Sequence, residues 1–329
     1  MTRSTTRELV ERAVAAEQAV LAFNVITLEH AEAVIAGAER AHADVLLQVS
    51  ERAIGFHHGK LAPLLTACAN LADQANVRIA IHLDHFQDVT LAEHAITTGK
   101  LLGVSSIMLD FARYPHIENV RLTRELSIRA QAEGLWVEAE LGEIGGKDGA
   151  HAPGVRTDPG EAIDFVSQTG VDALAVAVGS SHAMTSREAE LDIGLIAQLA
   201  AAVPVPLVLH GSSGVADVMI REAIVAGIRK VNVGTALNIA FTEAIRTFLV
   251  NNPGVSDPRP YLREGREAIS QTVAGLCGLA ANPVREQMTT PETVAGQLSG
   301  SKSPSAPTDN TPLRPFDRRD IAKPQLGAQ

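Results

Sequence analysis

Histidine and aspartate lie at or just after the ends of three apolar runs of the sequence. The run VRIAIHLDHFQD ends with His82, Asp84 and His85, and two later runs end in His182 and His210. Burying imidazole and carboxylate groups costs several kcal/mol unless something pairs with them. A catalytic zinc ion is such a partner, because it takes three protein ligands, often histidines, and leaves a fourth position open. These residues indicate a zinc site if the fold brings His85, His182 and His210 together.

Asp84 precedes His85, but we do not expect both to bind one metal, because successive residues of a strand point to opposite sides. A carboxylate beside a metal-polarised oxygen is well placed to transfer protons. We therefore interpret Asp84 as a catalytic acid/base, the alternative being a carboxylate that only orients a histidine. His82 shares a strand face with Asp84, so we expect it to form hydrogen bonds in the core or behind the metal.

Eight short apolar runs must position these residues. Between them lie segments such as 28–43 and 61–75, whose apolar residues recur at three- and four-residue spacing. Strands that alternate with such helices predict a parallel sheet, and eight units are typical of a (β/α)8 TIM barrel of about 250 residues. An open doubly wound sheet is less favoured, because no GxGxxG turn follows the first run. The runs are AVLAFNV, DVLLQVS, VRIAIHLDH, VSSIMLD, LWVEAEL, DALAVAVG, VPLVLHG and RKVNVG.

Polar residues gather at the ends of the predicted strands, and in a TIM barrel the active site lies at that face. Merely solvated strand ends would favour Gly, Asn, Lys and Ser, whereas this set contains three histidines and four acids. The barrel therefore directs all three histidines over one mouth. In strand order the residues are Asn24, Ser50, Asp84 with His85, Asp110, Glu138 with Glu140, His182, His210 and Asn232.

Two late turns indicate an anion site. LHGSSGV (209–215) and VNVGTAL (231–237) each place Gly, Ser or Thr between a strand and a helix. Backbone N–H groups and helix N-termini in such turns bind phosphate, and barrels often do so after strands seven and eight.

Composition narrows the class of protein. The chain has 329 residues with a formal net charge of −10, which argues against nucleic acid or an anionic membrane as partner. The N-terminus lacks the pattern of a secretory signal, so we expect a soluble, cytoplasmic protein. Cys68 and Cys277 have no disulfide or metal spacing and are interpreted as buried free thiols. Residues 282–329, rich in Ser, Pro, Gly and charge, predict a disordered tail after a barrel domain over 1–281.

The assembled motifs resemble the class II, zinc-dependent fructose-bisphosphate aldolase family, especially its tagatose- and ketose-bisphosphate branch. The resemblance runs from about residue 5 to residue 280 and is carried by the order of AFNV, IHLDH, VEAELGEIGG, LAVAVGSSH, PLVLHGSSG, KVNVGT and DPRPYL. It implies cleavage of a ketose bisphosphate to dihydroxyacetone phosphate and an aldehyde, as in glycolysis. Relatives form dimers or tetramers, so the resemblance also implies a homodimer or homotetramer.

The resemblance also implies residue roles. His85, His182 and His210 would hold the catalytic zinc, and Asp84 would transfer the proton at the hydroxyl of the bond that is made or broken. The family also uses a monovalent cation near the phosphate site. The remaining mouth residues would contact the enediolate and the phosphate of dihydroxyacetone phosphate. These substrate-binding candidates are Asn24, Ser50, Gly211, Ser213, Asn232 and Thr235.

Three further assignments depend on the resemblance alone. Asp110 and Glu140 match acids that bind a second, non-catalytic metal in some relatives. Arg259 matches an arginine that reaches the far phosphate of a neighbouring subunit's substrate. After LGEIGG, relatives carry a loop with an acidic pair, whereas this loop reads KDGAHAPGVRTDP. Asp148 is the first candidate for the base at the dihydroxyacetone phosphate carbon, and Glu143 is the second.

The departures from the family fall around the substrate. Ala183 follows the second zinc histidine where relatives have glycine, and Ala112 stands where they tend to have serine. These changes favour survival of zinc chemistry over strict specificity for fructose 1,6-bisphosphate. An aldolase for another sugar phosphate or sugar-acid phosphate, a non-catalytic partner subunit that keeps the metal, and a zinc hydrolase stay open. No lysine Schiff base is needed, and Lys230 opens the last strand at its non-catalytic end.

Overall fold

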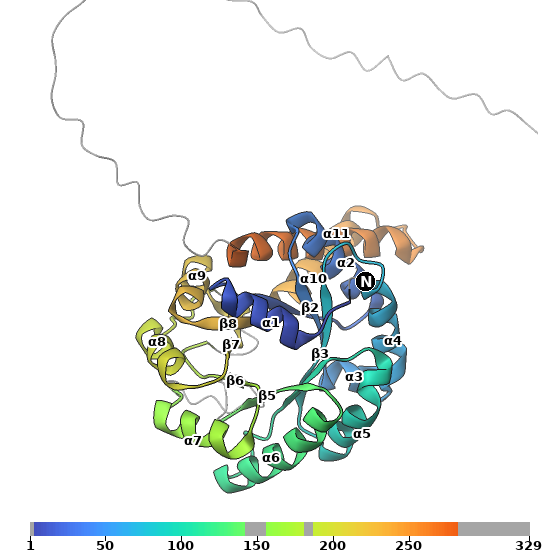
Figure 1. Cartoon of the computed structure of the whole chain (residues 1–329). Helices are drawn as coiled ribbons and strands as arrows, with labels where there is room; N and C mark the ends of the chain where they lie inside the picture. The colour runs from blue at the N-terminus through green and yellow to red at the C-terminus, as the bar shows by residue number, and fades with distance from the viewer. Residues whose placement is uncertain (1–2, 142–155, 181–186, 282–329) are drawn as a thin grey trace, which may run out of the picture. The chain divides into compact units, whose positions relative to one another are not determined.

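The computed structural model describes residues 3–141, 156–180 and 187–281. Within them, eight parallel strands close into a barrel in the order β1 to β8 (Figure 1). Each of the eight apolar runs supplies one strand, so the predicted TIM barrel is confirmed. The strands are β1 Val20–Asn24, β2 Val45–Ser50, β3 Ile79–Phe86, β4 Ser106–Leu109, β5 Trp136–Glu140, β6 Ala173–Ala175, β7 Leu207–Leu209 and β8 Ile228–Val233.

Helices surround the barrel (Figure 1). Several begin where the sequence offers a capping side chain: Ser50, Asp88 and Asp158 accept hydrogen bonds from the first turns of α3, α5 and α7. The helices are α1 Thr6–Ala15, α2 Leu28–Ala41, α3 Glu51–Phe56, α4 Leu61–Ala72, α5 Val89–Gly99, α6 His116–Ala132, α7 Pro159–Thr169, α8 Ile193–Ala202, α9 Asp217–Ala226, α10 Thr235–Asn251 and α11 Pro258–Ala281, with short 3-10 turns η1 Lys100–Leu102 and η2 Ser212–Gly214.

The barrel interior is closed at one end by α1, which crosses the barrel in Figure 1. Leu9 and Val10 of α1 are buried with inward-facing apolar residues, among them Leu46, Ala80 and Trp136. Trp136 is the first residue of β5, so α1 covers the end at which the strands begin. A second, larger apolar layer lies between the strands and the outer helices. The end of the barrel next to α1, called the lower end below, is therefore filled with apolar side chains. The polar strand ends face the opposite end, called the mouth.

Two glycines allow α2, α10 and α11 to pack closely beside the barrel. A Cβ at Gly37 of α2 would lie 2.5 Å from the carbonyl oxygen of Ser270 in α11. A Cβ at Gly265 of α11 would lie 2.5 Å from the ring of Phe241 in α10. Both distances are shorter than van der Waals contact, so any larger residue would push the helices apart.

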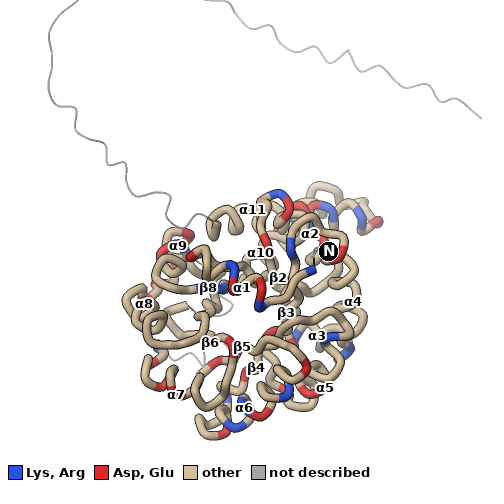
Figure 2. Tube along the Cα trace, in the orientation of Figure 1, with Lys and Arg blue, Asp and Glu red and all other residues tan. Residues whose placement is uncertain are grey.

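The outer surface carries charges of both signs on several helices (Figure 2). No helix of the described residues is long and apolar enough to cross a membrane. Cys68 and Cys277 are free and buried, as predicted, and burial raises the pKa of each thiol to about 12. Residues 282–329 lie outside the described ranges, so the tail and the domain boundary at 281 stay predictions.

Candidate active site

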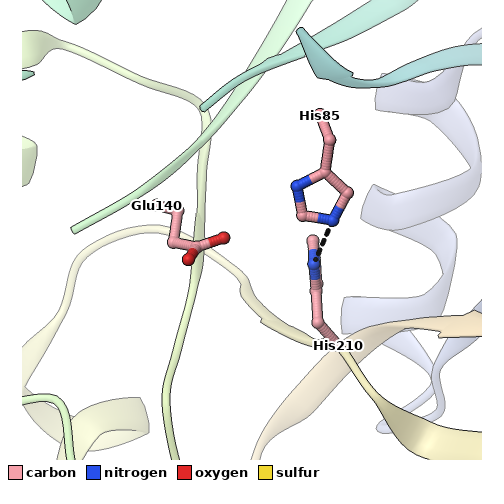
Figure 3. A group of neighbouring side chains, drawn as sticks. All are labelled: His85, Glu140 and His210. Carbon is pink, nitrogen blue, oxygen red and sulfur yellow. Dashed lines mark hydrogen bonds between the residues drawn. The ribbon is translucent and has the colours of Figure 1, made fainter. Parts of the chain in front are cut away.

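Three side chains that could bind a metal converge inside the barrel mouth. His85 comes from β3, Glu140 ends β5 and His210 directly follows β7, and their ligand atoms all lie within 4.8 Å of one another. His85 Nε2 is 3.1 Å from His210 Nδ1, and the Glu140 carboxylate lies beside the two rings (Figure 3). The rings stand at 88° to each other. Two ring nitrogens and a carboxylate therefore surround one small volume.

His85 enters this cluster through an irregularity in β3. The register of β3 against β4 shifts between Leu83 and Phe86, and His85 has a φ of +51°, a conformation uncommon outside glycine. Such a bulge re-aims the side chains next to it. The expectation that Asp84 and His85 point to opposite sides is therefore wrong, because His85 Nε2 lies 3.8 Å from Asp84 Oδ1. The acid/base candidate and the ligand candidate face each other.

A carboxylate engages the far nitrogen of each imidazole. His85 Nδ1 lies 3.0 Å from Asp110 Oδ2, which also accepts a hydrogen bond from Gln87. His210 Nε2 lies 2.9 Å from Glu138 Oε1. Metal-binding histidines commonly bond a carboxylate through the nitrogen that does not hold the metal. The donor set therefore fits a metal ion at the facing nitrogens. Asp110, expected at a second metal, lies on the Nδ1 side of His85.

The charges behind His210 are fully buried. Burial lowers the pKa of His210 to about 4, although the hydrogen bond with Glu138 opposes this. Burial would raise the pKa of Glu138, but Lys230 and then His210 outweigh it and hold that pKa well below its usual range. Lys230 Nζ lies 2.8 Å from Glu138 Oε2. Lys230 was expected to open β8 but is its third residue, and its ammonium reaches the site, which the sequence interpretation missed.

His82 occupies the interior between the site and α1. Its Nδ1 lies 2.8 Å from Ser106 Oγ, and its Nε2 lies 3.9 Å from Glu138 Oε2. The predicted hydrogen bonding of His82 in the core is thus confirmed. Burial, followed by the charge of Lys230, lowers the pKa of His82 well below its ordinary value, so the ring is neutral.

Polar residues of β1, β2 and β8 extend the site. Asn232 Nδ2 lies 3.5 Å from Asp84 Oδ1, and Gln48 donates a 2.6 Å hydrogen bond to Asn24 Oδ1. Ser50 Oγ caps α3. Sequence reasoning missed Gln48, which is only 2% exposed. Its signal is a polar residue inside an apolar run, two positions before Ser50 and hence on the same strand face.

The two Gly-rich turns are tied to each other. Gly211 has a φ of +66°, which favours glycine. Ser212 Oγ donates a 2.6 Å hydrogen bond to the carbonyl oxygen of Asn232. Ser213 Oγ accepts a 3.0 Å hydrogen bond from the backbone N–H that follows Thr235, at the start of α10. The hydroxyls of both serines thus hold the loop after β7 against the end of β8 and the first turn of α10.

The chain matches a family model described as class-II fructose-bisphosphate aldolase over residues 4–282. It belongs to this family. The class II aldolase is accordingly an aldehyde-lyase, as the motifs predict. It is 37% identical over 273 residues to a fructose-bisphosphate aldolase of Geobacillus stearothermophilus, an overlap of 82% of this chain and 93% of that protein.

Solved structures agree with the aldolase fold. The YdjI aldolase from Escherichia coli K12 superposes with a TM-score of 0.70 at 30% identity, over 84% of this chain and 97% of that one. A fructose-bisphosphate aldolase from Campylobacter jejuni gives a TM-score of 0.70 at 21% identity, over 84% of this chain and 95% of that one. The second likeness shows the fold alone.

Several predicted residues of this aldolase are not placed at the site. His182, Asp148 and Glu143 lie outside the described residues. Arg259 is exposed at the start of α11, where its guanidinium lies 2.6 Å from the Asp257 carboxylate. Its role at a neighbouring subunit's substrate stays a prediction.

Proposed function

We propose that this class II aldolase is zinc-dependent and cleaves a ketose bisphosphate of the fructose or tagatose type to dihydroxyacetone phosphate and an aldehyde. One observation carries the proposal: two imidazole nitrogens face each other at 3.1 Å with Glu140 beside them. Nitrogen and carboxylate ligands suit zinc. The fructose-bisphosphate aldolase of Geobacillus stearothermophilus supports a phosphorylated sugar as substrate.

His85 and His210 are the proposed zinc ligands in the described residues, and His182 is the third by its motif. When bound, zinc supplies a Lewis acid that stabilises the negative charge developing on the substrate oxygens. Glu140 and Asp110 are the proposed ligands of a second, non-catalytic metal. Asp110 also orients His85, because its Oδ2 lies 3.0 Å from His85 Nδ1.

Carboxylates carry the proposed proton transfers. Asp84 is buried and lies 3.8 Å from His85 Nε2, next to the metal position. During cleavage, Asp84 accepts the proton of the hydroxyl on the carbon where the C–C bond breaks, and it returns that proton in the condensation direction. A second group must protonate the carbon of dihydroxyacetone phosphate. Asp148 is proposed for this step, with Glu143 as the alternative.

The turns after β7 and β8 form the proposed phosphate site. Backbone N–H groups at a positive-φ glycine and at the start of α10 are suited to an anion, and a monovalent cation is proposed nearby. Arg259 would reach the substrate of a second subunit in a cytoplasmic homodimer or homotetramer. The proposed substrate-binding residues are Asn24, Ser50, Gly211, Ser213, Asn232 and Thr235.

Metal content and turnover test this proposal together. We expect purified protein to contain zinc, to cleave fructose or tagatose 1,6-bisphosphate, to lose cleavage after chelation and to regain it when zinc is added. Full activity in protein stripped of metal would contradict zinc dependence. Mg²⁺ added to stripped protein is the matched control and should restore little activity, because Mg²⁺ prefers oxygen ligands.

The substrate is tested in the condensation direction. Dihydroxyacetone phosphate is offered with glyceraldehyde 3-phosphate, malonic semialdehyde or other aldehydes, and the configuration at C4 of the product separates the fructose type from the tagatose type. If the protein uses only another acceptor aldehyde, the proposed substrate is wrong but the proposed aldol reaction is retained. Absence of hydrogen exchange at C1 of dihydroxyacetone phosphate with zinc bound would instead identify a non-catalytic subunit.

A further inference from the structure

We propose that Glu138 is a positioning residue of the metal site and that Lys230 holds it in this role. Together they keep the hydrogen of the His210 ring on Nε2, so that Nδ1 faces the metal. Neither Glu138 nor Lys230 is a proposed ligand or substrate contact. The inference rests on the proposed function, because it concerns how a proposed zinc ligand is oriented.

Two neighbours from the described part of the chain compete for His210 Nε2. Glu138 Oε1 lies 2.9 Å away and Asn232 Nδ2 lies 3.0 Å away. A carboxylate accepts a hydrogen from Nε2, whereas an amide nitrogen donates one to it. The two contacts therefore favour opposite tautomers of the ring. With the hydrogen on Nε2, Nδ1 presents its lone pair to His85; with the hydrogen on Nδ1, it does not.

Lys230 contacts both competitors. Its Nζ is fully buried, lies 2.8 Å from Glu138 Oε2 and donates a 2.6 Å hydrogen bond to Asn232 Oδ1. An ammonium only donates, so the amide oxygen of Asn232 faces Lys230. Lys230 thus faces one oxygen of the Glu138 carboxylate, and His210 Nε2 faces the other. The amide NH2 of Asn232 therefore faces both His210 Nε2 and Asp84 Oδ1, at 3.0 and 3.5 Å. We assign the hydrogen of Nε2 to the shorter contact, with the Glu138 carboxylate at 2.9 Å, and the Asn232 amide then donates to Asp84.

Asp110 orients the ring of His85 in the same way. Asp110 Oδ2 lies 3.0 Å from His85 Nδ1 and also accepts a hydrogen bond from Gln87. A hydrogen on His85 Nδ1 leaves the lone pair of Nε2 directed at His210 Nδ1, 3.1 Å away. Two lone pairs at this distance repel each other, whereas a cation between or beside them attracts both. Both carboxylates thus prepare the pair of rings for a metal.

Stability alone does not explain the buried ion pair. Glu138 and Lys230 are both 0% exposed, and replacing such a pair by apolar residues of similar volume is often neutral or stabilising. Glu138 of this pair contacts His210 Nε2, and Lys230 contacts both Glu138 and Asn232. We therefore attribute the buried ion pair to the orientation of the His210 ring.

The tautomer is measured in the wild-type protein, which avoids any folding defect. Histidine is labelled with ¹⁵N, long-range ¹H–¹⁵N spectra are recorded with zinc bound and after chelation, and a His210→Gln protein identifies the His210 signals. We expect the hydrogen on Nε2 in both states. A hydrogen on Nδ1 in the chelated protein, or a metal-bound Nε2 in the zinc form, would overturn the proposal.

The variant Glu138→Gln with Lys230→Met removes both charges, so that no buried charge is left without its partner. We expect its dissociation constant for zinc, measured by competition with a chelator, to rise by about 10- to 100-fold. Ser106→Ala is the matched control, since it removes a buried hydroxyl from the lower barrel, and it should leave the zinc affinity unchanged. An unchanged affinity in the folded double variant would contradict the proposal.

The outcomes separate this inference from the proposed function. A wild-type protein that binds zinc and cleaves substrate, but whose double variant keeps its zinc affinity, refutes only the role of Glu138 and Lys230. A wild-type protein that binds no zinc refutes the proposed function, whatever the tautomer of His210.

Discussion

The two ends of the barrel interior surround their buried polar groups with different kinds of side chain. Near α1 they are hydroxyl groups: Thr6 Oγ1 contacts Ser106 Oγ, which lies 2.8 Å from His82 Nδ1. At the mouth, carboxylates and an ammonium surround the imidazoles of His85 and His210. Near α1 the hydroxyls pair with each other and with His82. At the mouth, two imidazole nitrogens face each other. The end near α1 therefore serves stability, and the mouth offers the proposed site of a metal ion.

The largest effect is expected from His210→Ala at the mouth. Without this ring the proposed zinc loses a ligand, so bound zinc and aldol turnover should both fall to background while the barrel stays folded. Metal analysis, a cleavage assay and circular dichroism check this. His30→Ala, which removes a buried histidine from α2, should keep both properties. Full turnover in His210→Ala would show that the mouth does not hold a catalytic metal through His210.

Asp84→Ala should separate metal binding from proton transfer. We expect turnover to fall by about 10²- to 10⁴-fold, the usual contribution of an acid/base group. Zinc content should stay unchanged, because Asp84 is not a proposed ligand. Loss of the zinc together with the rate would show that Asp84 serves the metal rather than the proton.

Acid should weaken the metal-free fold through its buried histidines. Burial lowers the pKa of His82 and His210 from the ordinary value of 6.5. The unfolded chain therefore binds protons below pH 6.5 that the folded chain refuses, and stability falls as the pH falls. Each group should cost about 2 kcal/mol between pH 7 and pH 5. Urea unfolding followed by Trp136 fluorescence measures this, and a flat profile would show that both rings take up protons as readily in the folded chain as in the unfolded one.

The smallest effect is expected from Thr6→Val near α1. The change keeps the shape of the side chain but removes its contact with Ser106, so the free energy of unfolding should fall by about 1 kcal/mol. Zinc affinity and turnover should stay at the wild-type level in the same assays. A variant with normal stability but slow turnover would show that the lower end takes part in the chemistry.

Sequence patterns predicted the barrel because each strand is a separate apolar run with a helix after it, a local signal. The polar strand ends were predicted for the same reason. The bulge at His85 was missed, because it depends on the register between β3 and β4 rather than on alternation within β3. Lys230 was missed because a long side chain carries its charge away from its backbone position. Which carboxylate meets which imidazole depends on strand stagger, which residue types do not encode.

Anomalous diffraction at the zinc edge, from crystals of the zinc-loaded protein, tests the central claim most directly. The account predicts a strong peak at about 2.0–2.1 Å from His210 Nδ1 and from His85 Nε2, with Glu138 and Asp110 still bonded to the far nitrogens. A peak elsewhere in the molecule, with these two nitrogens holding no metal, would contradict it.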